Sequence, residues 1–223
     1  MYKHGYSIYR LGRGALSAHN AGMTATVPAA AHRHGNTAKI SHRAEPVWRE
    51  AQRLHRREVP EKMLRWLLDP ASLTLRLKSA CRGHFRVAVL AQGWARPHLN
   101  ELEVLGMRDN QWGFVREVQL LCDEQPWVFA RTIIPRTTLV GSNRRLTRLK
   151  TRPLGAVLFA DPTMTRGPVE IARITSGVRL YTSATQHLAK MPEAIWGRRS
   201  VFTLSGKPLL VSEIFLPGIA ACP

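Results

Sequence analysis

One arginine and one glutamate stand in otherwise apolar runs of the kind that form β-strands. With a period of two, one face of residues 114–122 collects Phe114, Arg116, Val118, Leu120 and Cys122. An arginine keeps its charge at any ordinary pH, so a buried Arg116 requires an anionic partner of matched geometry. The first hypothesis is therefore an anion-binding site around Arg116.

Glu213 is the matching group in the second apolar run. One face of residues 209–216 takes Leu209, Val211, Glu213 and Phe215. Burial among apolar side chains disfavours the charged form of a carboxyl group, so Glu213 could hold a proton at neutral pH and donate a hydrogen bond or carry a proton. The alternative is that Glu213 and Arg116 simply form a buried ion pair.

Two further groups could contact an anion beside Arg116. If a four-residue turn at 123–126 pairs Cys122 with Trp127, Arg131 faces the same side as Arg116, and a ligand with two carboxylates could use both. A one-residue slip would turn Arg131 outward. Pro153 suits a helix start, and the next amide, that of Leu154, would then lack an intrahelical acceptor and could hold a carboxylate.

Metal and nucleophile chemistry is not indicated by the sequence. The histidines show no ligand spacing, and no zinc pattern, phosphate-binding glycine-rich loop or serine-elbow motif occurs. The three cysteines, Cys81, Cys122 and Cys222, are far apart and odd in number, which predicts reduced thiols and a cytoplasmic location. Neither a metal nor a cofactor is expected.

The charge is strongly basic but scattered. The chain has 33 Lys and Arg against 15 Asp and Glu, a net charge of +18. Residues 1–44 hold six of these bases and no acid, which leaves 27 against 15, or +12, for the rest. This excess would attract a small anion and predicts no specific nucleic-acid partner. No apolar run approaches the roughly 20 residues that span a bilayer.

The elements that must position these groups favour an α+β fold. Residues 114–135 and 199–216 read as hairpins, and 84–90 and 169–174 as further strands. Helices are expected over 46–57, 60–68 and 72–77 and after Pro153, and a basic helical turn is expected at 142–150. Residues 94–111 are expected to be irregular, and residues 175–195 are expected to form a surface excursion. Tight turns between strands predict an antiparallel β-sheet that helices cover.

The domain organisation follows from composition. Residues 1–44, basic and without an apolar period, are expected to be a disordered tail, and Met23 is an alternative start. Residues 45–223 are expected to form a single domain. No coiled-coil pattern occurs, so a monomer is expected.

Four ordered blocks make the chain resemble the chorismate pyruvate-lyase family. They are VREVQLLC and PWVFARTIIP in the first hairpin, RPLGAVLF at 152–159 and WGRRSVFTLSGKPLLVSEIFLP at 196–217, with weaker similarity in WLLDPASLT at 66–74. The resemblance implies an antiparallel sheet with helical flaps over a buried ligand site. It also implies a cofactor-free elimination that converts chorismate to 4-hydroxybenzoate and pyruvate, the first committed step of ubiquinone biosynthesis.

Carried over by resemblance, Arg116 binds the ring carboxylate with help from the Leu154 amide, and Glu213 meets the ring hydroxyl. Leu73, where relatives can carry methionine, belongs to the flap over the site. As catalytic residues, Arg131 is expected to steady the leaving carboxylate, and Glu213 to orient the hydroxyl or relay the proton.

Two other functions remain open from the sequence. Ligand-sensing domains of some transcription regulators resemble this family in architecture, so the domain could bind an aromatic acid without reacting. Such domains usually follow a winged-helix DNA reader, for which residues 1–59 are too short and too poorly patterned. The third class is a nucleic-acid binder, for which DNA affinity that vanishes in moderate salt would indicate only incidental attraction.

Overall fold

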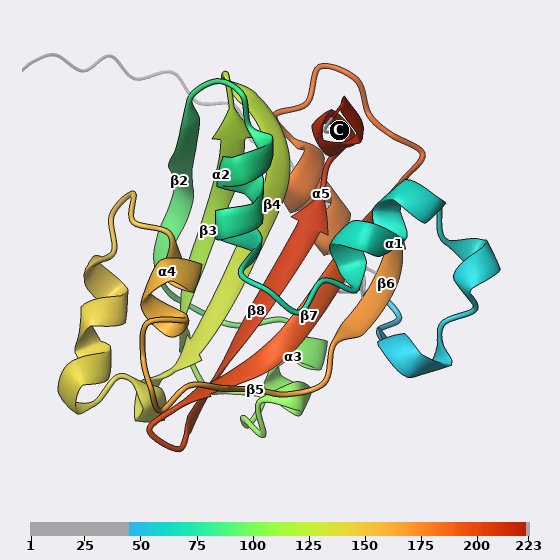
Figure 1. Ribbon diagram of the computed structural model, residues 1–223. Coiled ribbons are helices and arrows are strands. Elements are labelled where there is room, and N and C mark those ends of the chain that lie inside the picture. Colours follow the sequence, from blue (N-terminus) through green and yellow to red (C-terminus); the bar gives the residue numbers. More distant parts are fainter. Residues whose placement is uncertain (1–44, 222–223) are drawn as a thin grey trace, which may run out of the picture. The chain divides into compact units, whose positions relative to one another are not determined.

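The computed structural model describes residues 45–221, which are built on an eight-stranded antiparallel sheet (Figure 1). The strand order is β1-β6-β7-β8-β4-β3-β2, and β5 pairs with β7. The strands are β1 (Arg49–Glu50), β2 (Phe85–Ala95), β3 (Gly113–Cys122), β4 (Gln125–Pro135), β5 (Thr165–Arg166), β6 (Glu170–Thr175), β7 (Ala194–Leu204) and β8 (Lys207–Phe215). The predicted α+β class and both predicted hairpins are confirmed.

Short helices connect the strands. The α-helices are α1 (Glu61–Leu67), α2 (Leu73–Ala80), α3 (Leu99–Val104), α4 (Leu154–Leu158) and α5 (Arg179–Thr185). The 3₁₀ segments are η1 (Ala51–Arg53), η2 (Arg56–Glu58), η3 (Arg136–Thr138), η4 (Gly141–Arg148) and η5 (Pro217–Ala221). None of the helices in the described part of the chain is long and apolar enough to cross a membrane.

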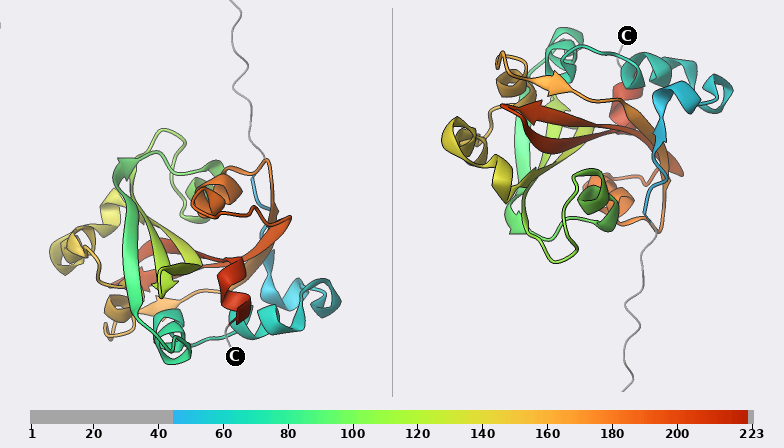
Figure 2. Two further views of the ribbon diagram at one scale, coloured as in Figure 1. Left: turned by 90° about the horizontal axis from the view of Figure 1, so that it is seen from above. Right: turned by 90° about the horizontal axis from the view of Figure 1, so that it is seen from below.

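Helices cover both faces of the sheet (Figure 2). We call the side that carries Arg116, Val118, Ala130, Val211 and Glu213 the front face, because these residues lie side by side across β3, β4 and β8. The helices α1, α2 and α4 cover the front face, while α3 and α5 cover the back face. The front face is therefore roofed by α2, whose Leu73 was expected to belong to a flap, and by α1 and α4.

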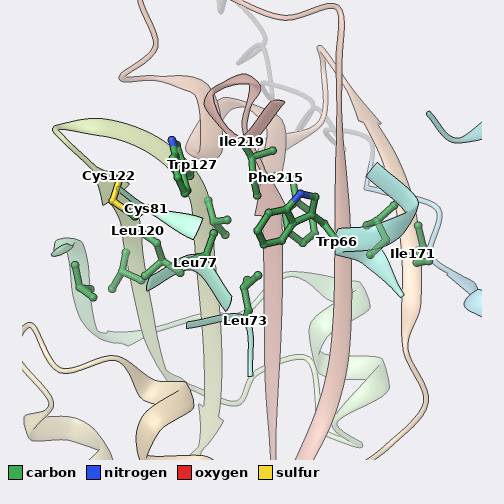
Figure 3. Packing of buried hydrophobic residues seen from close by; sticks show 14 of the residues in the cluster. Trp66, Leu73, Leu77, Cys81, Leu120, Cys122, Trp127, Ile171, Phe215 and Ile219 are labelled. Atoms are coloured by element: carbon green, nitrogen blue, oxygen red, sulfur yellow. A yellow bond between two sulfur atoms is a disulfide. The ribbon is translucent and has the colours of Figure 1, made fainter. Parts of the chain in front are cut away.

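The largest apolar cluster lies under α1 and α2. Trp66 of α1 and Leu73 and Leu77 of α2 are at most 6% exposed and pack on Leu120, Ile171 and Phe215 of the sheet (Figure 3). The rings of Trp66 and Phe215 lie 6.4 Å apart between centroids. Burial of large apolar side chains stabilises each of these contacts by about 1.5–3 kcal/mol per side chain. This packing holds the short helices in place over the sheet.

The first hairpin turns over two residues, not the four expected. Asp123 and Glu124 both have positive φ, 47° and 63°, and Cys122 pairs with Gln125. Two-residue turns with positive φ at both positions match the twist of the flanking strands. A register shift between Leu120 and Leu121 then sets the pairing of the rest of the hairpin. This register decides which face each arginine of the hairpin occupies.

Three further expectations need correction. Residues 46–57 form β1 and the segments η1 and η2 in place of a helix. Part of 94–111, expected to be irregular, forms α3. The supposed surface excursion at 175–195 contains α5, whose Leu180, Tyr181 and Ala184 are buried against the back face.

Two of the cysteines are joined, which contradicts the expectation of reduced thiols. Cys81, the C-cap of α2, forms a disulfide with Cys122 at the end of β3, 41 residues away in the sequence. The expected tail, residues 1–44, and Cys222 lie outside the described residues.

Candidate functional site

A narrow, partly open cavity of about 50 Å³ lies between the front face and the helices α2 and α4, which we call the flaps. Its walls are largely apolar, with Val118, Leu158 and Phe202 among them. Arg116 and Glu213 both line it, so the two residues that the sequence singled out share one hollow. Larger hollows exist: one of about 940 Å³ lies along Trp94 and Trp112, but its only charged lining residue is exposed. The small cavity is therefore the better candidate, because it alone of these two encloses a buried charge.

Arg116 is a buried cation held by neutral acceptors. Its side chain is 2% exposed. Nη1 donates to Oε1 of Gln92 at 2.7 Å, and Nη2 donates to the carbonyl oxygens of Lys150 and Arg152 at 2.7 and 3.3 Å. Burial lowers the pKa of the guanidinium from its ordinary value. No ion pair joins Arg116 to a carboxylate within residues 45–221, so its charge calls for an anionic ligand.

Glu213 is held by a different arginine. Nε of Arg198, which is 1% exposed, donates to Oε2 of Glu213 at 2.6 Å, and the two residues are register partners on β7 and β8. The alternative in which Glu213 pairs with Arg116 is therefore wrong.

Arg198 connects Glu213 to the segment between α1 and α2. Its Nη1 donates to the carbonyl oxygens of Trp66 and Asp69 at 3.0 and 2.6 Å, with Leu67 at 3.5 Å. These carbonyls lie at the end of α1, where a helix leaves its last acceptors without intrahelical donors. One arginine thus fixes both the carboxylate in the cavity and the entry to the flap α2.

Leu73 and Leu154 also line the cavity, from the first residues of α2 and α4. The two helices meet closely at Gly155, where a Cβ would stand 3.2 Å from Oγ1 of Thr74. A side chain at position 155 would therefore require the Thr74 side chain to shift by a few tenths of an ångström. Leu154 opens α4 after the N-cap Pro153, as expected, so its amide belongs to the turn whose N–H groups lack intrahelical acceptors.

Arg131 does not reach the cavity. In the observed register Arg116 opposes Thr132 and Arg131 opposes Glu117, which puts Arg131 on the back face. Its guanidinium is held there by Glu101 at 2.7 and 2.9 Å and by Glu117 at 2.7 Å. The expected position of Arg131 beside Arg116 is therefore wrong, and we assign it no catalytic role.

Gln92 and Arg198 were not among the site residues predicted from the sequence. Gln92 is a neutral amide on an edge strand, a residue type that marks no particular chemistry. Arg198 stands beside Arg199, and strand alternation could have placed one arginine on each face. The structure does so: Arg198 faces Glu213 in front and Arg199 faces Glu170 behind. Across the described residues, no group of three or more His, Cys, Asp or Glu side chains could hold a metal.

Comparison with known proteins identifies the family of this chain. The family model described as chorismate lyase matches residues 43–221. The chain belongs to the chorismate lyase family. A relative named "Probable chorismate pyruvate-lyase" from Aromatoleum aromaticum is 45% identical over 170 residues, covering 75% of this chain and 91% of its own length. Another of that name, from Pseudomonas aeruginosa, is 39% identical over 173 residues, covering 78% of this chain and 92% of its own length.

Solved structures resemble this chorismate lyase family member more distantly. The C-terminal domain of the histidine utilization repressor from Pseudomonas syringae pv. tomato matches with a TM-score of 0.47 and 11% identity, covering 60% of this chain and 93% of that one. A likeness at this level carries no argument about function. Family membership thus rests on the sequence relatives, and the arrangement around the cavity rests on the structure.

Proposed function

We propose that the protein is a chorismate pyruvate-lyase, which eliminates pyruvate from chorismate and leaves 4-hydroxybenzoate. The observation that carries the proposal is one narrow cavity lined by a carboxylate and by a guanidinium that has no acidic partner within residues 45–221. Chorismate is a small dianion with an apolar ring, and such a molecule suits an apolar cavity with a few convergent polar groups.

The cavity residues take distinct roles in this proposal. The ring carboxylate binds the free N–H groups of Arg116, with the amide of Leu154 as a second donor. The ring hydroxyl faces Glu213, whose Oε2 is engaged by Arg198 and whose other oxygen can accept a hydrogen bond. Leu73 covers the ring from the flap α2.

The chemical step needs orientation and the transfer of one proton. The ether bond at one ring carbon breaks, its electron pair leaves with the enolpyruvyl oxygen, and the hydrogen on the hydroxyl-bearing neighbour leaves as a proton. The ring becomes aromatic, which drives the reaction. Glu213 orients the hydroxyl or relays the proton, and the narrow apolar cavity limits the water around the departing group.

The flaps must open for this chemistry. The cavity holds about 50 Å³, whereas small-molecule sites usually offer roughly 300–1,000 Å³. Because α2 and α4 form its roof, substrate entry and product release require these short helices to move away from the sheet. The proposal also includes the ubiquinone pathway, which the family resemblance implies, together with the cytoplasmic location and the monomeric state that the sequence predicts.

The test is direct conversion. Purified protein is incubated with chorismate without added metal, next to a blank without protein, and 4-hydroxybenzoate and pyruvate are quantified. Equal amounts of both products are expected. The variant Arg116→Gln should lose turnover by about 100-fold or more, since a charge-assisted bidentate contact contributes about 3 kcal/mol. Tight 4-hydroxybenzoate binding without turnover would instead support the non-catalytic sensing alternative.

A further inference from the structure

Chorismate has two carboxylates, and the site as described accounts for one of them. If Arg116 takes the ring carboxylate, the carboxylate of the enolpyruvyl group needs another cation. Arg131, the residue expected to supply it, lies on the back face and is held by Glu101 and Glu117. The inference that follows rests on the proposed function and concerns this second carboxylate.

Arg166 is a half-buried arginine on the front side whose hydrogen-bond partners are neutral. It belongs to β5 and opposes Phe202 of β7. Nε donates to Oγ of Ser200 at 3.1 Å, and Nη1 donates to the carbonyl oxygen of Pro70 at 3.2 Å. A guanidinium has five N–H donors, so these two bonds leave three for a ligand.

The nearby acids are already paired with other arginines. Glu213 pairs with Arg198, and Asp69 pairs with Arg76 at 2.7 Å. Within residues 45–221, no ion pair joins a carboxylate to Arg166. Burial, followed by the charge of Arg198, lowers the pKa of Arg166, while Glu213 and Asp69 act in the opposite direction. Like Arg116, Arg166 is thus a partly desolvated cation that has no carboxylate partner within residues 45–221.

Arg166 also lies on the side of the cavity opposite Arg116, where the second carboxylate is expected. A row of directly opposed residues runs across the sheet from Arg116 through Thr132 and Val211 to Ser200, the acceptor of Arg166. The guanidinium of Arg166 lies over the ring of Phe202, 5.3 Å from its centroid, and Phe202 lines the cavity. Arg116 and Arg166 therefore flank the cavity from opposite ends of this row.

With the flaps open, the two carboxylates of chorismate would each face one of these two cations. With the ring carboxylate on Arg116 and the hydroxyl at Glu213, the enolpyruvyl ether leaves the ring from the carbon beside the hydroxyl-bearing one. Its carboxylate therefore lies close to Glu213 and away from Arg116. Arg198 is the poorer candidate for this carboxylate, because Glu213 already neutralises its charge and backbone carbonyls at the end of α1 take its Nη1.

We propose that Arg166 binds the carboxylate of the enolpyruvyl group and that Ser200 positions its guanidinium. When the ether bond breaks, the electron pair moves to the enolpyruvate oxygen, and Arg166 stabilises the charge that develops on this leaving group. The enolate then takes a proton on its methylene carbon and becomes pyruvate. The bond from Arg166 to Pro70 also links the leaving-group site to the segment that enters α2, so binding of the second carboxylate favours closure of the flap.

The test separates the second carboxylate from the rest of the ligand. Two probes are compared by calorimetry: 4-hydroxybenzoate, which lacks the enolpyruvyl group, and 3-(1-carboxyethenyloxy)-4-hydroxybenzoate, an aromatic dianion that cannot undergo the elimination. For Arg166→Gln we expect the Kd of 4-hydroxybenzoate to change by no more than about threefold, and the Kd of the dianion to rise by about 30- to 100-fold. In the same variant kcat/KM for chorismate should fall by about 100-fold or more.

Matched variants keep the result interpretable. Arg166→Lys should recover about tenfold of the lost kcat/KM, because it restores the charge without the planar fork. Arg173→Gln removes an arginine from an exposed ion pair with Glu193 and should match the wild type in all three measurements. Unchanged affinity of Arg166→Gln for the dianion, or an equal loss for both probes, would overturn the assignment of Arg166 while wild-type turnover still supports the lyase. A wild-type protein that binds neither probe and does not convert chorismate would overturn both proposals.

Discussion

Gln92 supplies Arg116 with a neutral hydrogen-bond acceptor. A carboxylate in the same position would neutralise the charge of Arg116. The two residues oppose each other on β2 and β3, and Nη1 of Arg116 donates to Oε1 of Gln92 at 2.7 Å. The amide is oriented by its other end, since Nε2 of Gln92 donates to the carbonyl oxygen of Thr147 at 3.2 Å. The cation is thus held in place and its charge is left for a ligand.

A carboxylate at position 92 should therefore compete with the ligand. We expect Gln92→Glu to weaken 4-hydroxybenzoate binding by about 10- to 100-fold, because the new side chain pairs with Arg116 and repels the ligand carboxylate. Position 92 is exposed, so the fold accepts the change. Calorimetric titration measures the effect, and Gln92→Leu, which adds no charge, should alter the Kd only a few-fold. Equal affinities for wild type and Gln92→Glu would show that Arg116 does not anchor the ligand.

The ion pair of Glu213 with Arg198 leads to a second prediction. Glu213→Gln keeps the shape and the bond to Arg198 but cannot accept a proton. We expect single-turnover conversion of chorismate to slow by about 100-fold, the usual contribution of a positioned acid or base. Glu170→Gln is the matched control, because Glu170 pairs with Arg199 at 2.7 Å on the other face and should leave turnover intact. Full turnover in Glu213→Gln would exclude the proton role.

The sequence could predict the residues whose position depends only on strand alternation. Arg116 and Glu213 stand out because each is the one charged group on an apolar face, and alternation puts them on that face regardless of the neighbouring strands. Leu73 and Leu154 follow from the family resemblance and from helix starts that proline and serine mark. These four residues line one cavity in the structure.

Arg131 could not be placed in the same way, because its face depends on the register between two strands. A turn of two residues and a shift at Leu120 gave a pairing one residue away from the expected one, and a one-residue change reverses the face. The disulfide was equally hidden, since only the fold brings Cys81 beside Cys122. In α5 the polar Thr182 and Ser183 stand between the buried pair Leu180–Tyr181 and the buried Ala184, which obscures a helix of two turns.

His98 should make stability depend on pH. Burial lowers its pKa, the charges of Arg131 and Arg179 lower it further, and Glu101 and Glu45 oppose the shift without reversing it. Between the lowered folded value and the unfolded value of about 6.5, the unfolded chain binds a proton that the folded chain does not. The contribution of His98 is therefore complete above about pH 6.5 and is lost as the pH falls through this window, by at most about 1.4 kcal/mol per pH unit.

Urea unfolding at pH 7.5, 6.5 and 5.5 measures this slope. We expect His98→Gln to flatten the fall in unfolding free energy across the range. His187→Gln, which removes an exposed histidine, should keep the wild-type slope. A slope that survives in His98→Gln would assign the acid sensitivity to another group.

The disulfide should contribute strongly to stability. Closing a loop of 41 residues restricts the unfolded chain, and the loop-entropy relation gives a stabilisation of about 4 kcal/mol. We expect the urea midpoint of the wild type to fall when a reductant is added. The double variant Cys81→Ser and Cys122→Ser should start at the lower midpoint and ignore the reductant, while Cys222→Ser should behave like the wild type. Identical wild-type midpoints with and without reductant would contradict this prediction.

The same bond should slow the escape of product. Cys81 ends the helix that begins with Leu73 over the cavity, and Cys122 ends the strand that carries Arg116, so the disulfide ties the flap to the floor of the site. With the bond reduced, α2 is held by the apolar packing of Leu73 and Leu77 on the sheet and by the ion pair of Arg76 with Asp69, so its C-terminal end loses its covalent attachment to β3. We therefore expect reduction to speed the dissociation of 4-hydroxybenzoate, measured by stopped-flow displacement, several-fold more in wild type than in the double serine variant. Equal rates in both redox states would mean that the flap opens without moving the end at Cys81.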